Sequence, residues 1–327
     1  MGNQKIGIAR LIHPEEIDMV LPVSLASLTA SNAISRRVLA NPQDFAPFDK
    51  ISLDFRGSRF RGMAPTKVRA MIGAGDKYVG VKVLAANEML PGPRAHSILF
   101  LLDRTGQAAY LAFDAERITD LRTASSAAVG VETLVRAPYV AAVLGIGPVG
   151  MATVFALAAL ESRPREIRLT ARSARECASV TDRVQACIAR QMVEVSALGV
   201  TLTPCEDIAQ ACHSAQVIVD CTSAPKRRPV IGPAQIYAAG DLLLVDVGKY
   251  ALDAAAIASF DSLIFDSLDL MALPSPASDH CREHRLTGQE LSQMMRSPEA
   301  AKGKTLYTVM GLPVIDTLLS ELVLGKL

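Results

Sequence analysis

The stretch VAAVLGIGPVGMATVFALAAL, at residues 140–160, constrains the fold of this chain more than any other feature. A short apolar run ends in a glycine pattern, and small and apolar residues at helical spacing follow. A buried strand, a tight glycine turn and a helix in this order begin a βαβ unit that binds a dinucleotide. We therefore predict a dinucleotide-binding unit that begins in the middle of the chain.

Each glycine of this turn has an expected role. Gly145 permits the tight turn, Gly147 lets the backbone approach a pyrophosphate, and Gly150 lets the helix pack against the strand. The helix N-terminus then offers free N–H groups to the phosphates. The alternative is an ordinary glycine-rich turn between a strand and a helix. The predicted phosphate-binding residues are Gly145, Ile146, Gly147, Pro148, Val149 and Gly150.

The rest of the chain divides around this unit. Residues 14–40 have helical spacing, residues 50–113 hold short β-rich runs typical of an antiparallel meander, and residues 116–137 form one long helical pattern with an apolar face. From residue 139 strands and helices alternate, which predicts an α/β doubly wound parallel sheet. The runs expected to form its strands are YVAAVLG, EIRLTAR, VTLTPC, QVIVDCT, DLLLVDV and SLIFDS.

The end of the chain, TLYTVMGLPVIDTLLSELVLGKL, reads as a strand and an apolar helix without an obvious place in that series. We expect it to pack on the N-terminal meander. The predicted domains are thus a discontinuous α+β domain at residues 1–121 plus 306–327, and a Rossmann domain at residues 122–305 inserted between its two parts.

The end of the second Rossmann strand indicates which dinucleotide binds. An NAD site usually has an acid there for the ribose hydroxyls, whereas this chain has Arg172 and Ser173. An arginine pairs with a 2′-phosphate, so NADPH is favoured and NADH is possible. The alternative is a solvated Arg172. Further candidates for cofactor binding lie after later strands, at Thr222, Ser223, Val247 and Gly248.

Composition excludes several classes of protein. The net charge is +1 with acids and bases interspersed, which gives no electrostatic footprint for nucleic acid. No apolar run is long enough to span a bilayer, and the N-terminus has no apolar signal segment. The six cysteines form no CxxC pair, which is typical of a reducing compartment, so we expect a cytoplasmic protein.

The string HCREH places His280 and His284 one helical turn apart and matches a metalloprotease pattern. That pattern needs a long helix and a third ligand, and this copy lies in a loop-like context. We therefore predict no metal site.

Four stretches together resemble the ornithine cyclodeaminase and mu-crystallin family. They are residues 78–130, with the lysine strand YVGVKVLA and the helix start RTA, then VLGIGPVG, IVDCTSAPKRRPVI and YTVMGLPVIDTLLSELVL. The resemblance implies that the first third and the C-terminal end build a domain for substrate binding and homodimerisation, with the Rossmann domain between them. It also implies hydride transfer at the α-carbon of an amino or imino acid.

The resemblance assigns residues to the substrate site. Lys82 and Arg122 match the lysine and arginine that bind the substrate carboxylate, and a third arginine corresponds to either Arg56 or Arg59. Cations suit this task because an arginine offers a planar two-pronged fork. Thr123 would start the long helix beside the phosphates. The alternatives are a strand lysine whose amine reaches solvent and an arginine on a helix surface.

The chain also departs from the cyclodeaminases. Their catalytic aspartate falls at about Lys249, and the nearby Asp246 lies inside the strand pattern. Where they carry an acid for a distal ammonium group, this chain has Arg69, which suits an acidic or neutral substrate side chain.

The predicted function is NADPH-dependent reduction of an α-imino acid, either cyclic or formed from a 2-oxo acid and an amine, with Lys82 or a water as proton donor. The alternatives are a cyclodeaminase-type lyase, an opine-like dehydrogenase of the N-(amino-carboxyethyl)-glutamate type and a non-catalytic NADPH-dependent carrier. The opine-like enzymes resemble NAD enzymes with an acid at the second strand, which this chain lacks.

Overall fold

The structure of the chain is a computed structural model. It describes the 327 residues except positions 1–6, 46–48, 55–66, 87–94, 105–107, 113–114, 172–178, 223–229, 238–240, 248–251, 274 and 297–302. The chain falls into two compact units. The first comprises Met1–Pro22, Asn41–Arg122 and Leu312–Leu327, and the second comprises Val23–Ala40 and Thr123–Gly311.

The first unit is built on a six-stranded sheet with the order β1-β6-β5-β4-β3-β2. Strands β2 to β6 pair antiparallel in sequence order, which confirms the predicted meander. Strand β1 pairs parallel with β6 at one edge and was not predicted. The elements are β1 (Gly7–Ile12), α1 (Pro14–Val20), η1 (Pro42–Phe45), β2 (Asp49–Asp54), β3 (Lys67–Ala74), β4 (Tyr78–Ala86), β5 (Ala95–Asp103), β6 (Ala108–Ala112) and α12 (Pro313–Leu324).

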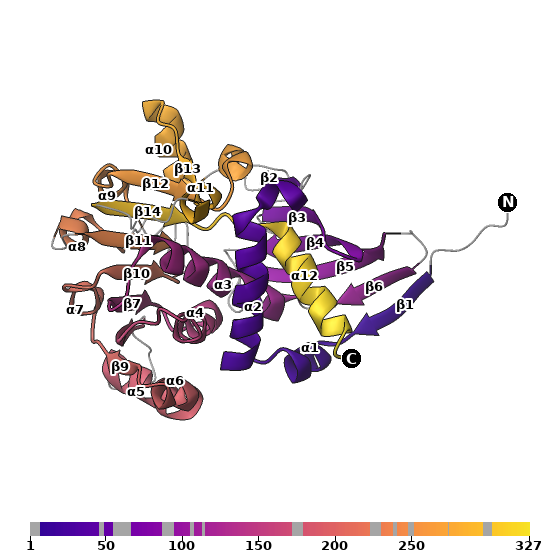
Figure 1. Cartoon of the computed structure of the whole chain (residues 1–327), viewed down its shortest axis with the longest axis horizontal. Helices are drawn as coiled ribbons and strands as arrows, with labels where there is room; N and C mark the ends of the chain where they lie inside the picture. Colours follow the sequence, from indigo (N-terminus) through magenta and orange to yellow (C-terminus); the bar gives the residue numbers. More distant parts are fainter. Residues whose placement is uncertain are drawn as a thin grey trace. The chain divides into compact units, whose positions relative to one another are not determined.

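The C-terminal helix α12 lies across strands β3 and β4 (Figure 1, yellow). The Thr317 hydroxyl donates to the carbonyl oxygen of Gly73 at 2.9 Å. One carboxylate oxygen of Glu321 accepts hydrogen bonds from the backbone N–H groups of Lys77 and Tyr78, each at 2.9 Å. A Cβ atom at Gly73 would lie 2.5 Å from the α12 backbone, so only glycine permits this close approach. The helix is therefore fixed onto the hairpin formed by β3 and β4.

The two faces of this sheet differ. The pairing register places Met71, Lys82 and Leu99 side by side on one face, and all three are buried. The other face is apolar but open to solvent, since Phe100 is 37% exposed and Ile51 is 51% exposed. Further large apolar residues on that face are Ile72, Val83 and Leu102.

The second unit contains an eight-stranded, wholly parallel sheet with the order β13-β12-β14-β11-β10-β7-β8-β9. It confirms the predicted doubly wound sheet, and each of the six expected runs forms a strand. The strands are β7 (Val140–Leu144), β8 (Glu166–Thr170), β9 (Thr201–Pro204), β10 (Val217–Asp220), β11 (Leu242–Asp246), β12 (Ser262–Phe265), β13 (Gln289–Glu290) and β14 (Lys304–Thr308).

One helix of this unit, α2 (Leu25–Ala40), precedes the meander in sequence, and the other helices follow it. They are α4 (Pro148–Ala158), α5 (Val180–Gln191), α6 (Val193–Ala197), α7 (Ile208–Cys212), α8 (Pro233–Tyr237), α9 (Ala254–Ile257), η2 (Leu268–Ala272), α10 (Pro276–His284) and α11 (Leu291–Arg296). Helix α2 packs on α4 and α11, and the Asn32 side chain donates to the carbonyl oxygen of Ala156 at 2.9 Å. Assigning α2 to the N-terminal domain was therefore wrong, because its packing partners follow much later in the chain.

The expected place of the last strand was also wrong. Strand β14 does not pack on the meander but lies inside the parallel sheet, between β11 and β12. Leu306 and Tyr307 are fully buried, as a central strand covered on both faces requires. The second unit consequently extends to Gly311 rather than ending at residue 305, and only the helix that follows packs on the meander.

One helix, α3 (Glu116–Leu134), contributes to both units. We expected one apolar face, yet every residue from Leu121 to Val131 is buried. Small residues make this possible, because a Cβ at Gly130 would clash with the ring of Tyr307. The helix is thus a core element rather than an amphipathic surface helix.

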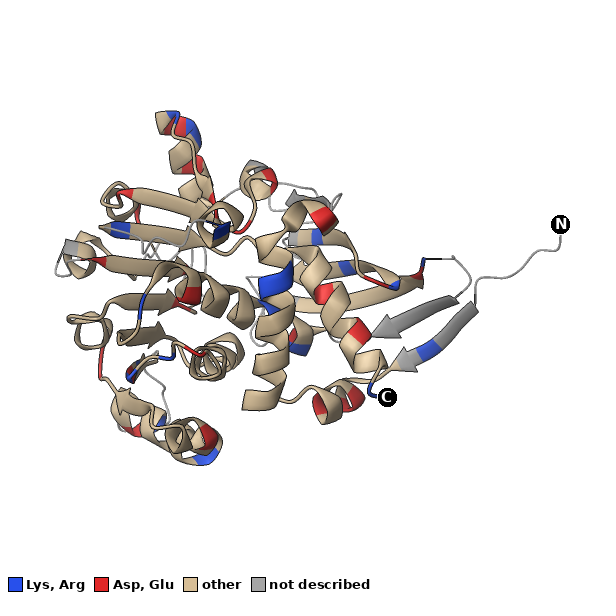
Figure 2. Ribbon diagram, viewed as in Figure 1, with Lys and Arg blue, Asp and Glu red and all other residues tan. Residues whose placement is uncertain are grey.

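Charged side chains of both signs are interspersed over the described elements, as Figure 2 shows. Within the described residues, no single helix is long and apolar enough to cross a membrane.

Candidate functional site

The glycine turn between β7 and α4 has the predicted geometry. Gly145 has a φ of +96°, which a residue with a side chain rarely adopts. A Cβ at Gly150 would clash with the carbonyl oxygen of Gly145, so close packing of helix on strand requires glycine there. Apart from Gly147 itself and its nearest chain neighbours, no atom of the described residues lies within 4 Å of the place that a Cβ would take there. The turn therefore leaves room for a ligand at the position expected to face a pyrophosphate.

The start of α4 fits an anion. Gly147 is the N-cap without a side-chain hydrogen bond, and Pro148 occupies the first turn. The first N–H groups of a helix have no partners within the helix, so they can donate to phosphate oxygens. Ile146 is buried and Val149 is half-buried. The residues of this turn thus fit a dinucleotide pyrophosphate.

The turn lies at the point where the order of the strands along the sheet reverses. Strands β7 and β10 are neighbours, and the sheet continues to β8 and β9 on one side and to β11 on the other. A Cβ at Gly145 would lie 3.1 Å from the carbonyl oxygen of Cys221, which follows β10 directly. Ligands of open parallel sheets bind at such switch points.

Thr222 lies at this edge but its hydroxyl turns toward its own strand. The backbone N–H and the hydroxyl of Thr222 both donate to one carboxylate oxygen of Asp220, at 3.0 Å and 2.7 Å. Thr222, which was predicted to contact the cofactor, therefore shapes the turn through its two hydrogen bonds to Asp220. Ser223, predicted beside it, lies outside the described residues.

Three buried acids lie at this same edge and were not predicted as a group. Asp220 ends β10, Asp246 ends β11, and Asp266 follows β12, each at most 2% exposed. Asp266 accepts a hydrogen bond from the N–H of Gly311 at 2.6 Å. The sequence does carry a signal for them, since each acid ends a buried apolar run. Within the described residues, no group of three or more histidines, cysteines or acids could hold a metal ion.

The two residues predicted to distinguish NADPH from NADH lie beyond the part of the chain that the structure describes. Strand β8 ends at Thr170, and both Arg172 and Ser173 lie outside the described residues. Val247 is half-buried directly after β11, whereas Gly248 and Lys249 also lie outside.

The first unit contains a buried cluster of charges around Lys82. Lys82 and Asp316 are each 1% exposed, and the Lys82 ammonium donates to Oδ1 of Asp316 at 2.8 Å. The ammonium also donates to the hydroxyl of Thr119. Nε of Arg122 lies 3.5 Å from Oδ2 of Asp316. The structure thus brings together the two cations predicted to bind a carboxylate, and neither is a surface residue.

Burial governs the protonation of this cluster. Loss of hydration lowers the pKa of Lys82, and the positive charge of Arg122 lowers it further, while Asp316 opposes both effects. Burial raises the pKa of Asp120 to about 7. Asp120 is half-buried, and its charge interacts with those of Lys82 and Arg122. The cluster therefore contains a carboxyl group that titrates near neutral pH.

Arg69 lies on the same face of the sheet as Lys82. It pairs with Leu84 across β3 and β4, two residues along from the pair of Met71 and Lys82, and side chains two residues apart on a strand share a face. Arg69 is half-buried. Thr123 is buried next to Arg122 on α3. The third predicted arginine, Arg56 or Arg59, lies outside the described residues.

Sequence reasoning missed Asp316, as it also missed Thr119 and Asp120 of the same cluster. Asp316 is the single acid in the apolar stretch VMGLPVIDTLLS and lies in the first turn of α12. A lone acid in so apolar a pattern is itself a signal, because a buried carboxylate needs a partner.

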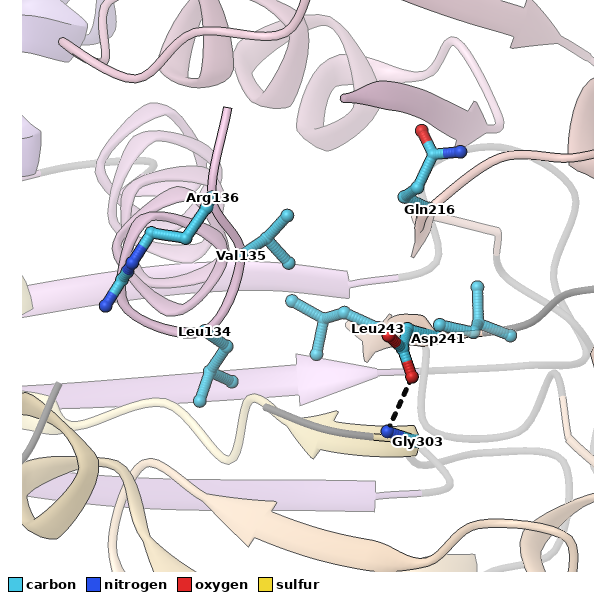
Figure 3. A pocket seen from close by; sticks show the side chains of 8 residues that line it. Leu134, Val135, Arg136, Gln216, Asp241, Leu243 and Gly303 are labelled. Atoms are coloured by element: carbon cyan, nitrogen blue, oxygen red, sulfur yellow. Dashed lines mark hydrogen bonds between the residues drawn. The ribbon is translucent and has the colours of Figure 1, made fainter. Parts of the chain in front are cut away.

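A pocket of about 150 Å³ lies elsewhere in the second unit (Figure 3). It opens before the amino ends of β10, β11 and β14, opposite to the edge that carries the glycine turn. Its polar groups serve the fold, since Asp241 accepts from the N–H of Gly303 at 2.8 Å and Gln216 accepts from that of Val140. It does not belong to the predicted site.

Comparisons with solved structures show the fold of the whole chain. Δ1-Pyrroline-2-carboxylate reductase of Thermococcus litoralis, in complex with NADH and L-proline, matches with a TM-score of 0.75 and 16% identity, covering 97% of this chain and 96% of that chain. An archaeal alanine dehydrogenase dimer with bound NAD matches with a TM-score of 0.72, 17% identity and the same two coverages. Iminosuccinate reductase of Paracoccus denitrificans, in complex with NAD⁺, matches with a TM-score of 0.69 and 17% identity, covering 96% and 95%.

Among curated proteins, no sequence matches this chain significantly. The model of the ornithine cyclodeaminase/mu-crystallin family, however, matches residues 28–326. The match spans nearly the whole chain, including the glycine turn and the charge cluster. The chain therefore belongs to the ornithine cyclodeaminase/mu-crystallin family.

Proposed function

We propose that this protein is an enzyme that reduces an α-imino acid to an amino acid with a nicotinamide cofactor. The observation that carries the proposal is the pair of buried cations, Lys82 and Arg122, held around Asp316 in the first unit. Buried cations of this kind suit an α-carboxylate, and the glycine turn of the second unit suits a dinucleotide. The similar solved structures include two reductases of imino acids.

The residues of the chain have distinct tasks in this reaction. Lys82 and Arg122 bind the α-carboxylate and thereby orient the imine carbon. The reduced nicotinamide supplies a hydride to that carbon when it is bound. An imine nitrogen gains a proton in the overall reaction, and Lys82 as an ammonium, or a water, donates it. Burial lowers the pKa of Lys82, which favours proton release. If Lys82→Met retained full turnover, Lys82 would not be the donor.

We propose NADPH as the preferred cofactor, with NADH possible. Support comes from the sequence after β8, where Arg172 and Ser173 stand in place of an acid. The similar solved structures contain NADH, NAD or NAD⁺, so the preference must be measured. Arg172→Ala should weaken NADPH binding about tenfold or more and leave NADH binding nearly unchanged.

We propose that Arg69 selects substrates with an acidic or neutral side chain. Its place on the face that carries Lys82 supports a contact with the substrate side chain. Arg69→Ala should raise KM for an acidic substrate, such as an imine formed from 2-oxoglutarate, more than for one formed from pyruvate. Equal changes for both substrates would remove Arg69 from side-chain selection.

We propose a homodimer formed through the apolar outer face of the first unit. Large apolar side chains on that face are 36–51% exposed, which is unusual for a sheet without a partner. Phe100→Asp should shift the mass measured by light scattering from dimer to monomer. We also propose that the protein works in the cytoplasm, since the described cysteines, among them Cys205 and Cys281, are free thiols.

The first experiment measures oxidation of NADPH and NADH with pyrroline-2-carboxylate, piperideine-2-carboxylate, and pyruvate or 2-oxoglutarate with amines. Turnover with NADPH well above NADH supports the proposal in full. A preference for NADH favours the opine-like dehydrogenase. Ammonia release from a diamino acid without net cofactor change favours the lyase, and tight NADPH binding without any turnover favours the carrier.

A further inference from the structure

We propose that Asp316 is a positioning residue that holds Lys82 and Arg122 in place for the substrate carboxylate and keeps Lys82 in its ammonium form. This inference rests on the proposed function for its substrate, but its effect on Lys82 is measurable without turnover.

One carboxylate contacts both cations. Oδ1 of Asp316 accepts from the Lys82 ammonium at 2.8 Å, and Oδ2 lies 3.5 Å from Nε of Arg122. A bridging carboxylate fixes the separation of the two cations, as binding to the two oxygens of a substrate carboxylate requires. The three groups carry one net positive charge, which an α-carboxylate would neutralise.

Asp316 itself is held rigidly. It lies in the first turn of α12, and the Thr317 hydroxyl ties this helix to Gly73 on the hairpin that carries Lys82. The close approach at Gly73 leaves little room for the helix to shift. A rigid helix therefore fixes the carboxylate, and the carboxylate fixes the two cations.

The groups described around Lys82 come from two helices and from the neighbouring strands. Helix α12 contributes Asp316, and α3 contributes Thr119, Asp120 and Arg122. On the sheet face, the neighbours of Lys82 in the register are the apolar Met71 and Leu99, and the charged Arg69 lies two residues from Met71 on the same face. Asp316 is therefore the acid in direct contact with Lys82 among the described residues, and Asp120 acts at longer range.

The test compares Asp316→Asn with Glu321→Gln, which makes the same chemical change on the same helix away from Lys82. The amide oxygen that Glu321→Gln introduces can still accept the two backbone hydrogen bonds that hold α12 in place, so this control removes a charge without freeing the helix. The Lys82 ammonium is observed by NMR on protein labelled with ¹⁵N at the lysine side chains, and Lys82→Arg assigns its signal. We expect Asp316→Asn to lower the pKa of Lys82 by about one unit or more, since an opposite charge within hydrogen-bonding distance favours the charged form. Glu321→Gln should leave that pKa unchanged.

Two further readouts concern the substrate site. Binding of pyrrole-2-carboxylate, measured by calorimetry, should weaken about tenfold or more in Asp316→Asn and hardly at all in Glu321→Gln. The alkaline limb of the kcat/KM profile should move to lower pH in Asp316→Asn alone. An unchanged Lys82 pKa in Asp316→Asn, or an equal change in both variants, overturns the proposal.

The outcomes separate this proposal from the proposed function. If the wild-type protein reduces no imino acid but Asp316→Asn still shifts the Lys82 pKa and weakens carboxylate binding, the role of Asp316 stands and the reductase activity falls. If Asp316→Asn does not fold, Asp316→Glu carries the test. It retains the charge but moves it by one methylene, so the pKa of Lys82 should stay and carboxylate binding should weaken. If Asp316→Glu changed both the pKa of Lys82 and carboxylate binding, or changed neither, the proposal would be contradicted.

Discussion

Asp120 offers a quantitative test of the electrostatics of the charge cluster. It lies on α3 near Lys82 and Arg122, and burial raises its pKa from 3.8 to about 7. Arg117 and the two cations of the cluster lower this pKa but do not offset the loss of hydration. The folded protein therefore retains a proton between these pH values that the unfolded chain releases. Asp120→Asn removes this titration and retains the shape of the side chain.

The sign and size of the effect follow from the two pKa values. Below about pH 4 the carboxyl is protonated in both states, so the wild type and Asp120→Asn should differ little in their pH dependence. As the pH rises to about 7, the wild type loses stability relative to Asp120→Asn by about 1.4 kcal/mol per pH unit. The interval between 3.8 and about 7 sets a ceiling of about 4 kcal/mol. Because Asp120 is only half-buried, solvent screening should reduce this to about 2 kcal/mol.

The assay is urea unfolding of wild type and Asp120→Asn at about pH 5 and about pH 8. The variant should gain stability over the wild type between the two pH values. Asp44→Asn, the same change at an exposed carboxyl of the same unit, is the matched control. If Asp120→Asn were less stable than wild type by the same amount at both pH values, burial would not control the charge of Asp120.

Other predictions concern glycines and the C-terminal helix. Gly73→Val should destabilise the fold by about 2–3 kcal/mol, measured by urea unfolding, because a side chain there would meet the α12 backbone. Gly147→Ala should leave stability unchanged but weaken NADPH binding, measured by calorimetry, since that position opens into free space among the described residues. Glu321→Gln should cost about 1 kcal/mol of stability, because the amide accepts the two backbone hydrogen bonds less strongly than the carboxylate. If Gly147→Ala lost as much stability as Gly73→Val, the space beside Gly147 would not be open.

Most helices and strands could be predicted because each has, within its own segment, a pattern of residues that indicates its type. The short β-rich runs of β3 to β5 and the apolar runs of β7, β10 and β11 each indicate a strand without knowledge of its neighbours. The glycine turn was predictable residue by residue, because Gly145 and Gly150 answer to steric needs within one βαβ unit. Lys82 was predicted as a site residue through the family resemblance alone, and its burial became apparent only in the structure.

Position within the fold was less predictable than the existence of an element. Strand β14 reads KTLYT, and nothing in these residues says that it pairs between β11 and β12. Helix α2 packs on α4, more than a hundred residues later, so its unit follows from tertiary contacts rather than from its own pattern. Both errors have the same cause, since long-range pairing is decided by complementary surfaces that no single segment displays.

The partnership of Lys82 with Asp316 shows how far a sequence argument could reach. Each is a lone charge in an apolar stretch, YVGVKVLA and LPVIDTLL, and burying either charge alone costs more than the fold could offset. A buried lysine on the meander therefore needs an acid as its partner, and that acid must itself lie in an apolar stretch. Asp220, Asp246 and Asp316 each lie in an apolar stretch of the sequence, on a different element, so each could be this partner. Only the packing of α12 on β3 and β4 selects Asp316, across 234 residues of chain.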